Sequence, residues 1–364
     1  MRRLVLFLIC ILLLSAGCRQ YSVPGVGKSA PENVVDPAEY DGGVPYSPLT
    51  FFRQPQVAIY KEIVYYECDP DDKEGYSPVI YSVPVSGTET PQPLFNGKML
   101  GIYEGILLAC DDEAYYAADL KAGSSWKRLQ PAGVHQGTAA GEGKIFLFGY
   151  TADGNYADII DLSSLSASRQ LTEREIVAAE AVGDTLYYIK ANSADYSLYR
   201  ATFQEQQEEI LAETPCYQLS YAGGKVICHG SQSGATVFDP ETGASVFHPA
   251  ANTEVINGIL RLKNHGQNPR YLELATDQWV EDPGFEIDNA TEIENGLMLR
   301  QENSDIRLLQ LNGKEYTADL SGFAAGSNAA ANEHGGAFLG GASLCIADWS
   351  TGTVRQFFHR ELIA

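Results

Sequence analysis

A short apolar run recurs along this chain at intervals of about forty residues. The runs begin at Ile63, Ile106, Ile145, Leu186, Val226, Ile259, Leu297 and Ala337. Seven intervals span the 274 residues between the first start and the last, a mean of about 39 residues. A fixed period of this size indicates one supersecondary unit repeated in a solenoid, a propeller or an array.

Each period contains four strand-like segments. In the fourth period they are residues 177–182, 186–189, 197–203 and 209–213, separated by polar residues. In the fifth, segments 236–239 and 245–248 are joined by Pro-Glu-Thr-Gly, a composition typical of a tight turn. The repeat therefore predicts four short antiparallel strands and no helix.

We expect an all-β fold, and a β-propeller within that class, because closing the sheets into a ring protects their edges. Eight repeats between Thr50 and Phe358 predict eight four-stranded blades. Seven is the alternative if the Gly- and Ala-rich segment 330–349 serves another purpose. A sandwich with regularly spaced strands is a further alternative. Either the eighth repeat is complete, or a strand near Leu49 to Arg53 completes it.

The N-terminus has the features of an export signal. Two arginines precede eleven apolar residues, Leu4 to Leu14, too few to span a bilayer comfortably. We predict a signal peptide over 1–17, cleaved between Gly17 and Cys18. Residues 18–48 contain five prolines and no apolar period, so they read as a flexible tether before a body over 49–364.

The segment Leu14-Ser15-Ala16-Gly17-Cys18 resembles the lipobox of bacterial lipoproteins, although Ser15 occupies a place where Leu is more usual. The resemblance implies a lipid on Cys18 and a membrane-lipid partner through it. Buried acyl chains contribute about 0.8 kcal/mol per CH₂ to membrane binding. The expected location is extracytoplasmic, anchored to the cell membrane, or to an outer membrane if the organism has one, which Arg19 would permit.

The charge balance excludes one class of partner. There are 25 Lys and Arg against 47 Asp and Glu, a formal charge of -22. A polyanion repels phosphate backbones, so we expect no nucleic acid partner.

Two propeller families resemble parts of the body. Segments 237–247 and 345–357 resemble the repeat unit of quinoprotein-like propellers, a family that includes the outer-membrane assembly lipoprotein BamB. The Tyr-rich second strands, with Tyr65, Tyr66, Tyr187 and Tyr188, resemble YWTD propellers of the low-density-lipoprotein-receptor type, found in bacterial lipoproteins of unassigned role. We favour the second resemblance, which implies a fold and a location and leaves function open.

The seven cysteines form no close metal-ligand pair. Cys10 lies in the signal, and Cys68, Cys110, Cys216, Cys228 and Cys345 lie in the body. Apolar neighbours predict buried thiols for most of them, while a disulfide such as Cys216 to Cys228 stays open.

No pattern of catalytic residues emerges. His135, His229, His248, His265, His334 and His359 show no metal-ligand spacing. Loop 230–234 has Gln where a nucleophile elbow needs Ser. The acidic loop 69–75 departs from the EF-hand pattern. Acidic runs such as 111–113 and 281–282 resemble glycosidase acids only by adjacency. We expect no catalytic residue, cofactor or metal site.

The sequence thus predicts a membrane-anchored, non-catalytic binding or scaffold propeller that engages an unknown envelope protein, peptide or glycan. One alternative is a carbohydrate-active envelope hydrolase or lyase with its acids at the channel mouth. Another is an outer-membrane assembly scaffold like BamB.

Overall fold

The eight apolar runs lie in the second strands of eight four-stranded sheets. A computed structural model describes residues 57–68, 78–123, 125–191, 196–203, 208–213, 216, 218–230, 234–281, 283–284, 290–293, 296–300, 306–311, 314–323, 328–340 and 343–359. Their regular structure consists of β-strands. In this part of the chain no helix has the length and apolarity needed to cross a bilayer.

The sheets are numbered here in chain order, each with four consecutive strands. Sheets 1 to 4 contain β1 (Val57–Tyr60), β2 (Ile63–Cys68), β3 (Val79–Pro84), β4 (Gln92–Asn96); β5 (Lys98–Tyr103), β6 (Ile106–Cys110), β7 (Ala114–Asp119), β8 (Lys127–Pro131); β9 (Val134–Gly141), β10 (Lys144–Thr151), β11 (Gly154–Asp161), β12 (Ser166–Thr172); β13 (Ile176–Val182), β14 (Thr185–Ala191), β15 (Tyr196–Thr202), β16 (Glu209–Glu213). Sheets 5 to 8 contain β17 (Gln218–Ala222), β18 (Lys225–Gly230), β19 (Gly234–Phe238), β20 (Ser245–His248); β21 (Asn252–Ile256), β22 (Ile259–Lys263), β23 (Arg270–Glu273), β24 (Gln278–Val280); β25 (Ala290–Ile293), β26 (Gly296–Arg300), β27 (Ile306–Leu311), β28 (Lys314–Asp319); β29 (Asn328–Ala331), β30 (Gly335–Leu339), β31 (Ser343–Asp348), β32 (Thr353–Phe358).

Neighbouring strands in each sheet pair antiparallel in sequence order. In sheet 4, for example, Tyr188 of β14 stands opposite Ala179 of β13 on one side and Tyr199 of β15 on the other. The all-β class and the repeated four-stranded unit are confirmed.

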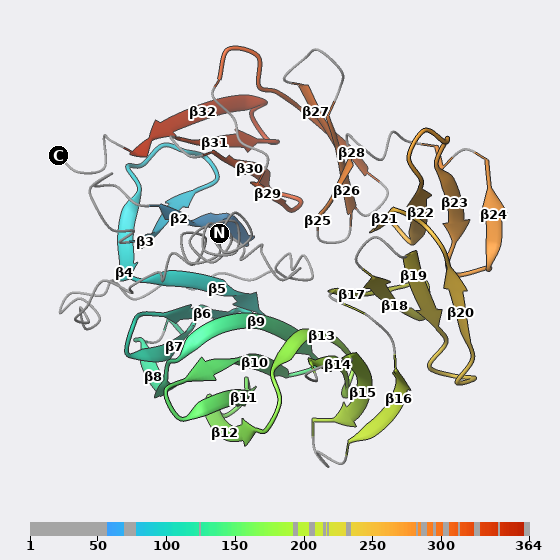
Figure 1. The fold of residues 1–364 in the computed structure, drawn as a ribbon. Coiled ribbons are helices and arrows are strands. Elements are labelled where there is room, and N and C mark those ends of the chain that lie inside the picture. The colour runs from blue at the N-terminus through green and yellow to red at the C-terminus, as the bar shows by residue number, and fades with distance from the viewer. Residues whose placement is uncertain are drawn as a thin grey trace, which may run out of the picture.

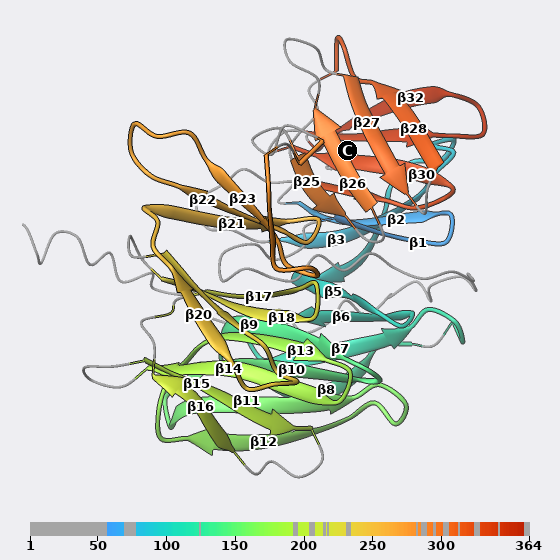
Figure 2. The same cartoon turned by 90° about the vertical axis from the view of Figure 1, so that its right-hand side faces the viewer.

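The sheets follow one another around a centre, with the first strand of each sheet innermost and the fourth outermost (Figures 1 and 2). The strands β1, β5, β9 and β13 therefore lie near the axis, while β4, β8, β12 and β16 form the outer edge. The described residues form a propeller-like ring, in which each sheet packs its faces against its two neighbours.

The ring closes without exchanging a strand. Sheet 8 is built from β29 to β32, all from the C-terminal end, and β1 lies against β29 and β30. One apolar cluster joins sheet 1 to sheet 8 and includes Ile59, Tyr66, Val83, Leu344 and Ile346. Of the two expected modes of closure, the eighth repeat is complete by itself; Leu49 to Arg53 lie outside the described residues.

Large aromatic side chains fill the spaces between sheets. Those that are almost completely buried include Tyr60, Tyr65, Tyr66, Tyr115 and Tyr156. Burying one large apolar side chain contributes about 1.5–3 kcal/mol, so these tyrosines stabilise the ring strongly. The Tyr-rich second strands thus serve packing.

Several predictions concern residues outside the described ranges. These are the signal over 1–17, the cleavage and lipidation positions Gly17 and Cys18, the tether over 18–48, and the acidic loop 69–75. They stay predictions.

Candidate functional site

The turn between the first and second strands carries a carboxylate in five sheets that follow one another around the ring. These turns hold Glu333 in sheet 8, Glu62 in sheet 1, Glu104 in sheet 2, Glu142 in sheet 3 and Asp184 in sheet 4. We call this set of turns, with the other residues between the same strands, the turn arc. In each sheet the turn joins the two innermost strands, so the turn arc lies at one mouth of the ring.

Backbone conformation fixes these turns locally. Both central residues of the sheet 2 turn have positive φ, 52° at Glu104 and 81° at Gly105. Two positive φ values define a type I′ turn, whose twist matches that of the flanking strands. Gly105 also permits close approach, since a Cβ there would lie 2.7 Å from the Tyr60 hydroxyl of sheet 1.

Hydrogen bonds link successive turns of the turn arc. The Asn332 Nδ2 group in sheet 8 donates to the Lys61 carbonyl in sheet 1 at 2.8 Å. The amide N–H of Gly143 in sheet 3 donates to Glu104 Oε1 in sheet 2 at 2.7 Å. The amide N–H of Glu142 donates to the Gly183 carbonyl of sheet 4 at 3.1 Å. The turn of sheet 8 is therefore tied to that of sheet 1, and the turns of sheets 2, 3 and 4 are tied to one another.

Asn332 organises the junction of sheets 8 and 1. Besides its bond to Lys61, its Oδ1 atom accepts the amide N–H groups of His334 at 2.9 Å and Gly335 at 3.3 Å. Its own carbonyl accepts from Trp349 Nε1 at 2.9 Å. This buried side chain thus holds the turn of sheet 8 in shape and ties it to sheet 1.

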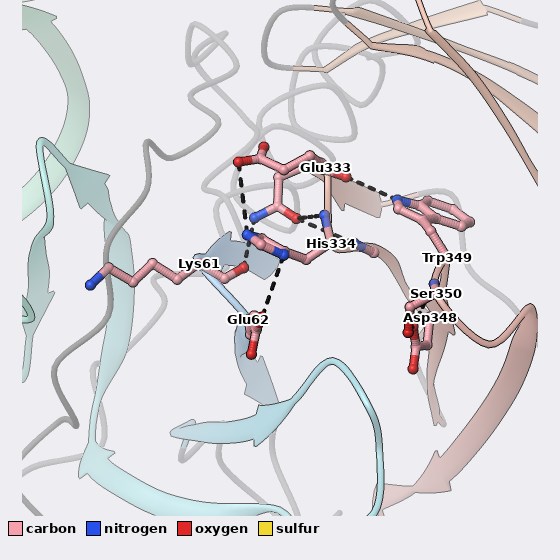
Figure 3. Close-up of polar contacts among 9 residues, drawn as sticks. Lys61, Glu62, Glu333, His334, Asp348, Trp349 and Ser350 are labelled. Atoms are coloured by element: carbon pink, nitrogen blue, oxygen red, sulfur yellow. Dashed lines mark hydrogen bonds and ion pairs between the residues drawn. The ribbon is translucent and has the colours of Figure 1, made fainter.

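The His334 ring lies between two carboxylates, as Figure 3 shows. Its Nδ1 atom is 3.6 Å from Glu62 Oε1, and its Nε2 atom is 3.8 Å from Glu333 Oε1. The Glu62 and Glu333 side chains are 69% and 61% exposed, against 34% for His334. The group is open to solvent, and both carboxylates are available to an incoming cation.

Two residues support this junction from β31 and the turn that follows it. The Trp349 ring stacks on Tyr316 of sheet 7, with ring centroids 5.2 Å apart. Asp348 Oδ1 accepts the N–H of Ser350 at 2.8 Å and its hydroxyl at 2.7 Å. Burial tends to raise the pKa of Asp348, but these bonds outweigh burial and hold the pKa below its usual value. Asp348 therefore serves the turn.

The acidic run at residues 111–113 serves a turn. Asp111 Oδ1 accepts the amide N–H groups of Glu113 and Ala114, both at 2.8 Å, so the 111–113 run is a capped turn. Of the 281–282 pair only Glu281 is described. Among the described residues no group of three or more His, Cys, Asp or Glu is placed to hold a metal ion.

The five body cysteines are buried and free, and Cys216 and Cys228 share one apolar cluster. Burial raises the pKa of Cys216 well above its usual value, and the neighbouring Cys228 raises it further. Most of these thiols were expected to be buried, and the Cys216–Cys228 disulfide left open by the sequence is not formed.

The histidines are not gathered at one mouth. His229 bridges sheets 5 and 6, with Nε2 3.0 Å from Ser220 Oγ and Nδ1 2.8 Å from Thr253 Oγ1. Burial lowers the pKa of His229 to about 4. His135 contacts Thr138, and burial, with a smaller effect of Lys98, lowers its pKa to about 4 as well. Both imidazoles are neutral at pH 7.

Sequence reasoning missed Asn332 and the turn carboxylates as a set. Each carboxylate lies one or two residues before the start of a second strand. The forty-residue period could therefore have identified these carboxylates as a set. At Asn332 the sequence shows only a polar residue in a Gly- and Ala-rich segment.

No protein-family model matches the chain, and no curated protein is similar to it in sequence. Among solved structures, the computationally designed Ika8 protein is 13% identical over 84% of this chain and 97% of that chain, with a TM-score of 0.46. BamB from Moraxella catarrhalis is 10% identical over 86% and 97%, with a TM-score of 0.44. A chain of the nidogen–laminin complex is 11% identical over 60% and 91%, with a TM-score of 0.36. At such scores the fold rests on this chain's own strand pairing and ring order.

Proposed function

We propose that this chain is a lipid-anchored, extracytoplasmic β-propeller of eight blades that acts as a non-catalytic binding or scaffold module. Its partner at the turn arc is a protein or peptide segment rich in Lys or Arg. The observation that carries the proposal is the row of turn carboxylates from sheet 8 to sheet 4, with hydrogen bonds that join the turns of sheets 8 and 1, of sheets 2 and 3, and of sheets 3 and 4.

The charge of the turns decides the chemistry of the partner. The described turns of the turn arc hold five carboxylates and one lysine, Lys61. Exposed carboxylates at Glu62 and Glu333 keep their hydration until a cation arrives, so attraction at this mouth is long-ranged and sensitive to salt. A basic segment would gain most from it.

The test uses the full chain and labelled decalysine, with decaglutamate as the negative probe. We expect the triple variant Glu62→Gln, Glu104→Gln, Glu142→Gln to bind decalysine at least tenfold more weakly at low salt. The control is Asp153→Asn, Glu173→Gln, Glu315→Gln, which removes the same charge at exposed positions outside the turn arc and away from β20 and β24. Equal losses in both triple variants would refute the turn arc as the site.

Anchoring has a separate test. Cys18→Ala should move the protein from the membrane fraction to the soluble fraction, because a lipid on that thiol would be its attachment. Unchanged membrane association would refute the anchor.

One observation favours the hydrolase alternative, namely the imidazole of His334 between Glu62 and Glu333. Paired acids in glycosidases stand roughly 5–10 Å apart across the scissile bond, in a site that surrounds the sugar. A panel of chromogenic glycosides distinguishes the two functions. Hydrolysis abolished by Glu62→Gln would favour the enzyme over the binding module.

A further inference from the structure

The eight outermost strands differ in how their free edges are protected. An edge strand presents unpaired N–H and C=O groups, and proteins block unwanted pairing there with charged residues or proline. Six of the eight outer strands follow this rule, through Pro93 in β4, Lys127 in β8, Arg169 in β12, Glu209 in β16, Lys314 in β28 and Arg355 in β32. The exceptions are the neighbours β20 and β24.

The strand β20, Ser-Val-Phe-His, contains neither proline nor a charged residue at neutral pH. Burial, with a smaller effect of Arg270, lowers the pKa of His248, so its ring is neutral there. Val246 and Phe247 are 56% and 55% exposed on opposite faces of the strand. This edge is thus both unprotected and apolar.

The outer strands β20 and β24 carry side chains that meet at the outer side of sheets 5 and 6. Val246 stands opposite Val237, and Trp279 of β24 stands opposite Leu272. Val237 and Leu272 are buried in one cluster between sheets 5 and 6, so Val246 and Trp279 continue that cluster outward. The His248 and Trp279 rings meet edge to face, 5.7 Å apart. Trp279 is 50% exposed, and Arg270 lies over its ring.

The backbone of β20 has groups to offer. The Asp239 N–H donates to the Ala244 carbonyl at 2.8 Å, so the main-chain carbonyl of Ala244 points toward the partner arm of the hairpin. Since main-chain groups alternate in direction along an antiparallel strand, Ser245 and Phe247 direct theirs away from β19. An added strand could bond to them without disturbing the sheet.

Charge selects the occupant. Around β20 and β24 stand five carboxylates, Asp239, Glu241, Glu273, Asp277 and Glu281, against Lys225 and Arg270. Lys225 pairs with Asp239 at 3.0 Å and with Asp277 at 3.1 Å, which leaves Glu241, Glu273 and Glu281 against Arg270. A second copy of this chain, at a net charge of -22, would bring like charge to an acidic edge.

We propose that the free edge of β20 is a docking site for an extended partner segment with alternating apolar and basic residues. The segment adds a fifth strand to sheet 5, places apolar side chains over Val246 and Trp279, and directs Lys or Arg to the surrounding carboxylates. This mode of recognition uses main-chain bonds for affinity and alternate side chains for specificity. The site lies on the outer wall of the ring and does not depend on the turn arc.

The experiment measures fluorescence anisotropy of a labelled decapeptide of alternating Val and Lys against the full chain, with alternating Val and Glu as the comparison. We expect micromolar binding of the basic peptide and at least tenfold weaker binding of the acidic one. Val246→Lys should weaken binding of the basic peptide at least tenfold. The control is Leu171→Lys, which puts the same charge on an equally exposed leucine of the protected strand β12 and should leave binding unchanged.

Ser245→Pro separates strand pairing from charge, since it removes an outward N–H without altering charge, and it should also weaken binding. Thermal unfolding confirms that each variant folds. The proposal is overturned if both lysine variants weaken binding equally, or if only the turn-arc variants do. It is also overturned if the chain sediments as a dimer that Val246→Lys dissociates, because a second copy then occupies the edge.

Discussion

The seams between neighbouring sheets are held in two different ways. At three of the junctions between sheet 8 and sheet 4, hydrogen bonds join the inner turns, as between Glu104 and Gly143. Between sheets 5 and 6, a buried imidazole, His229, joins Ser220 to Thr253 inside the seam. The outermost strands of sheets 8 to 4 contain charged residues or proline, whereas the outermost strands of sheets 5 and 6, β20 and β24, contain neither.

A closed ring can thus leave surface available for binding in two places. In sheets 8 to 4 the inner turns are held in place and the outer strands are protected against pairing. The carboxylates of the turn arc then remain for binding a partner. Between sheets 5 and 6 the buried side chain of His229 joins the two sheets, and main-chain groups of the outer strand β20 face away from the sheet. Two surfaces of different chemistry therefore coexist in one ring.

The largest contrast is expected between two aromatic residues. Tyr156 is fully buried between sheets 2 and 3. The substitution Tyr156→Ala should lower the free energy of unfolding by about 3–5 kcal/mol. Trp279→Ala should cost less, about 1–2 kcal/mol, because half of its side chain is exposed. Urea unfolding measures both. A similar loss in the two variants would mean that Trp279, at the outer edge of sheet 6, is packed as tightly as Tyr156.

The His229 seam should weaken in acid. Its folded pKa of about 4 lies below the ordinary value of 6.5, so below pH 6.5 the unfolded chain gains a proton that the folded chain does not. Stability is therefore complete above pH 6.5 and falls toward pH 4, by about 3 kcal/mol. Unfolding at pH 7 and pH 4.5 should show a smaller loss in His229→Gln than in the parent. His265→Gln, in an exposed loop, should leave the loss unchanged.

At the junction of sheets 8 and 1, Asn332→Ala should cost about 1–3 kcal/mol, because it removes the side chain that bonds to the part-buried Lys61 carbonyl and to two amide N–H groups. Asn252→Ala, at an exposed position, should cost under about 0.5 kcal/mol. Urea unfolding of the two variants decides, and equal costs would remove Asn332 from its proposed place at the junction.

The smallest effect is expected within the turn arc. Glu104→Ala removes the acceptor for the Gly143 N–H and should cost about 1 kcal/mol, whereas Glu104→Gln keeps an acceptor and should cost less. Thermal unfolding at matched salt compares them. If Glu104→Gln lowered stability as much as Glu104→Ala, the contribution of Glu104 to stability would come from its charge. The hydrogen bond from Gly143 would then contribute little.

The sequence predicted the repeated part of the fold well, because the pattern that it relies on is local. The run beginning at Leu186 lies in β14, and the segments around it lie in the other strands of sheet 4. Periodic apolar residues report which strands pair inside one sheet. The buried thiols followed from the same reasoning.

The contacts between sheets were not predictable, since they join residues far apart in the chain. The bond from Asn332 to Lys61 spans 271 positions, and nothing at either position marks it. The His229 link likewise depends on the register of β17, β18 and β21. Lipidation at Cys18 stays a prediction from the sequence.

The way the ring closes has a consequence for its assembly. Because every sheet consists of four consecutive strands, all strand pairing is local in sequence, and low contact order favours rapid folding. Sheets can form one after another as the chain emerges, in the order of synthesis. Only the packing of sheet 8 against sheet 1 joins the two ends of the body, so we expect this closure to be the slow, long-range step.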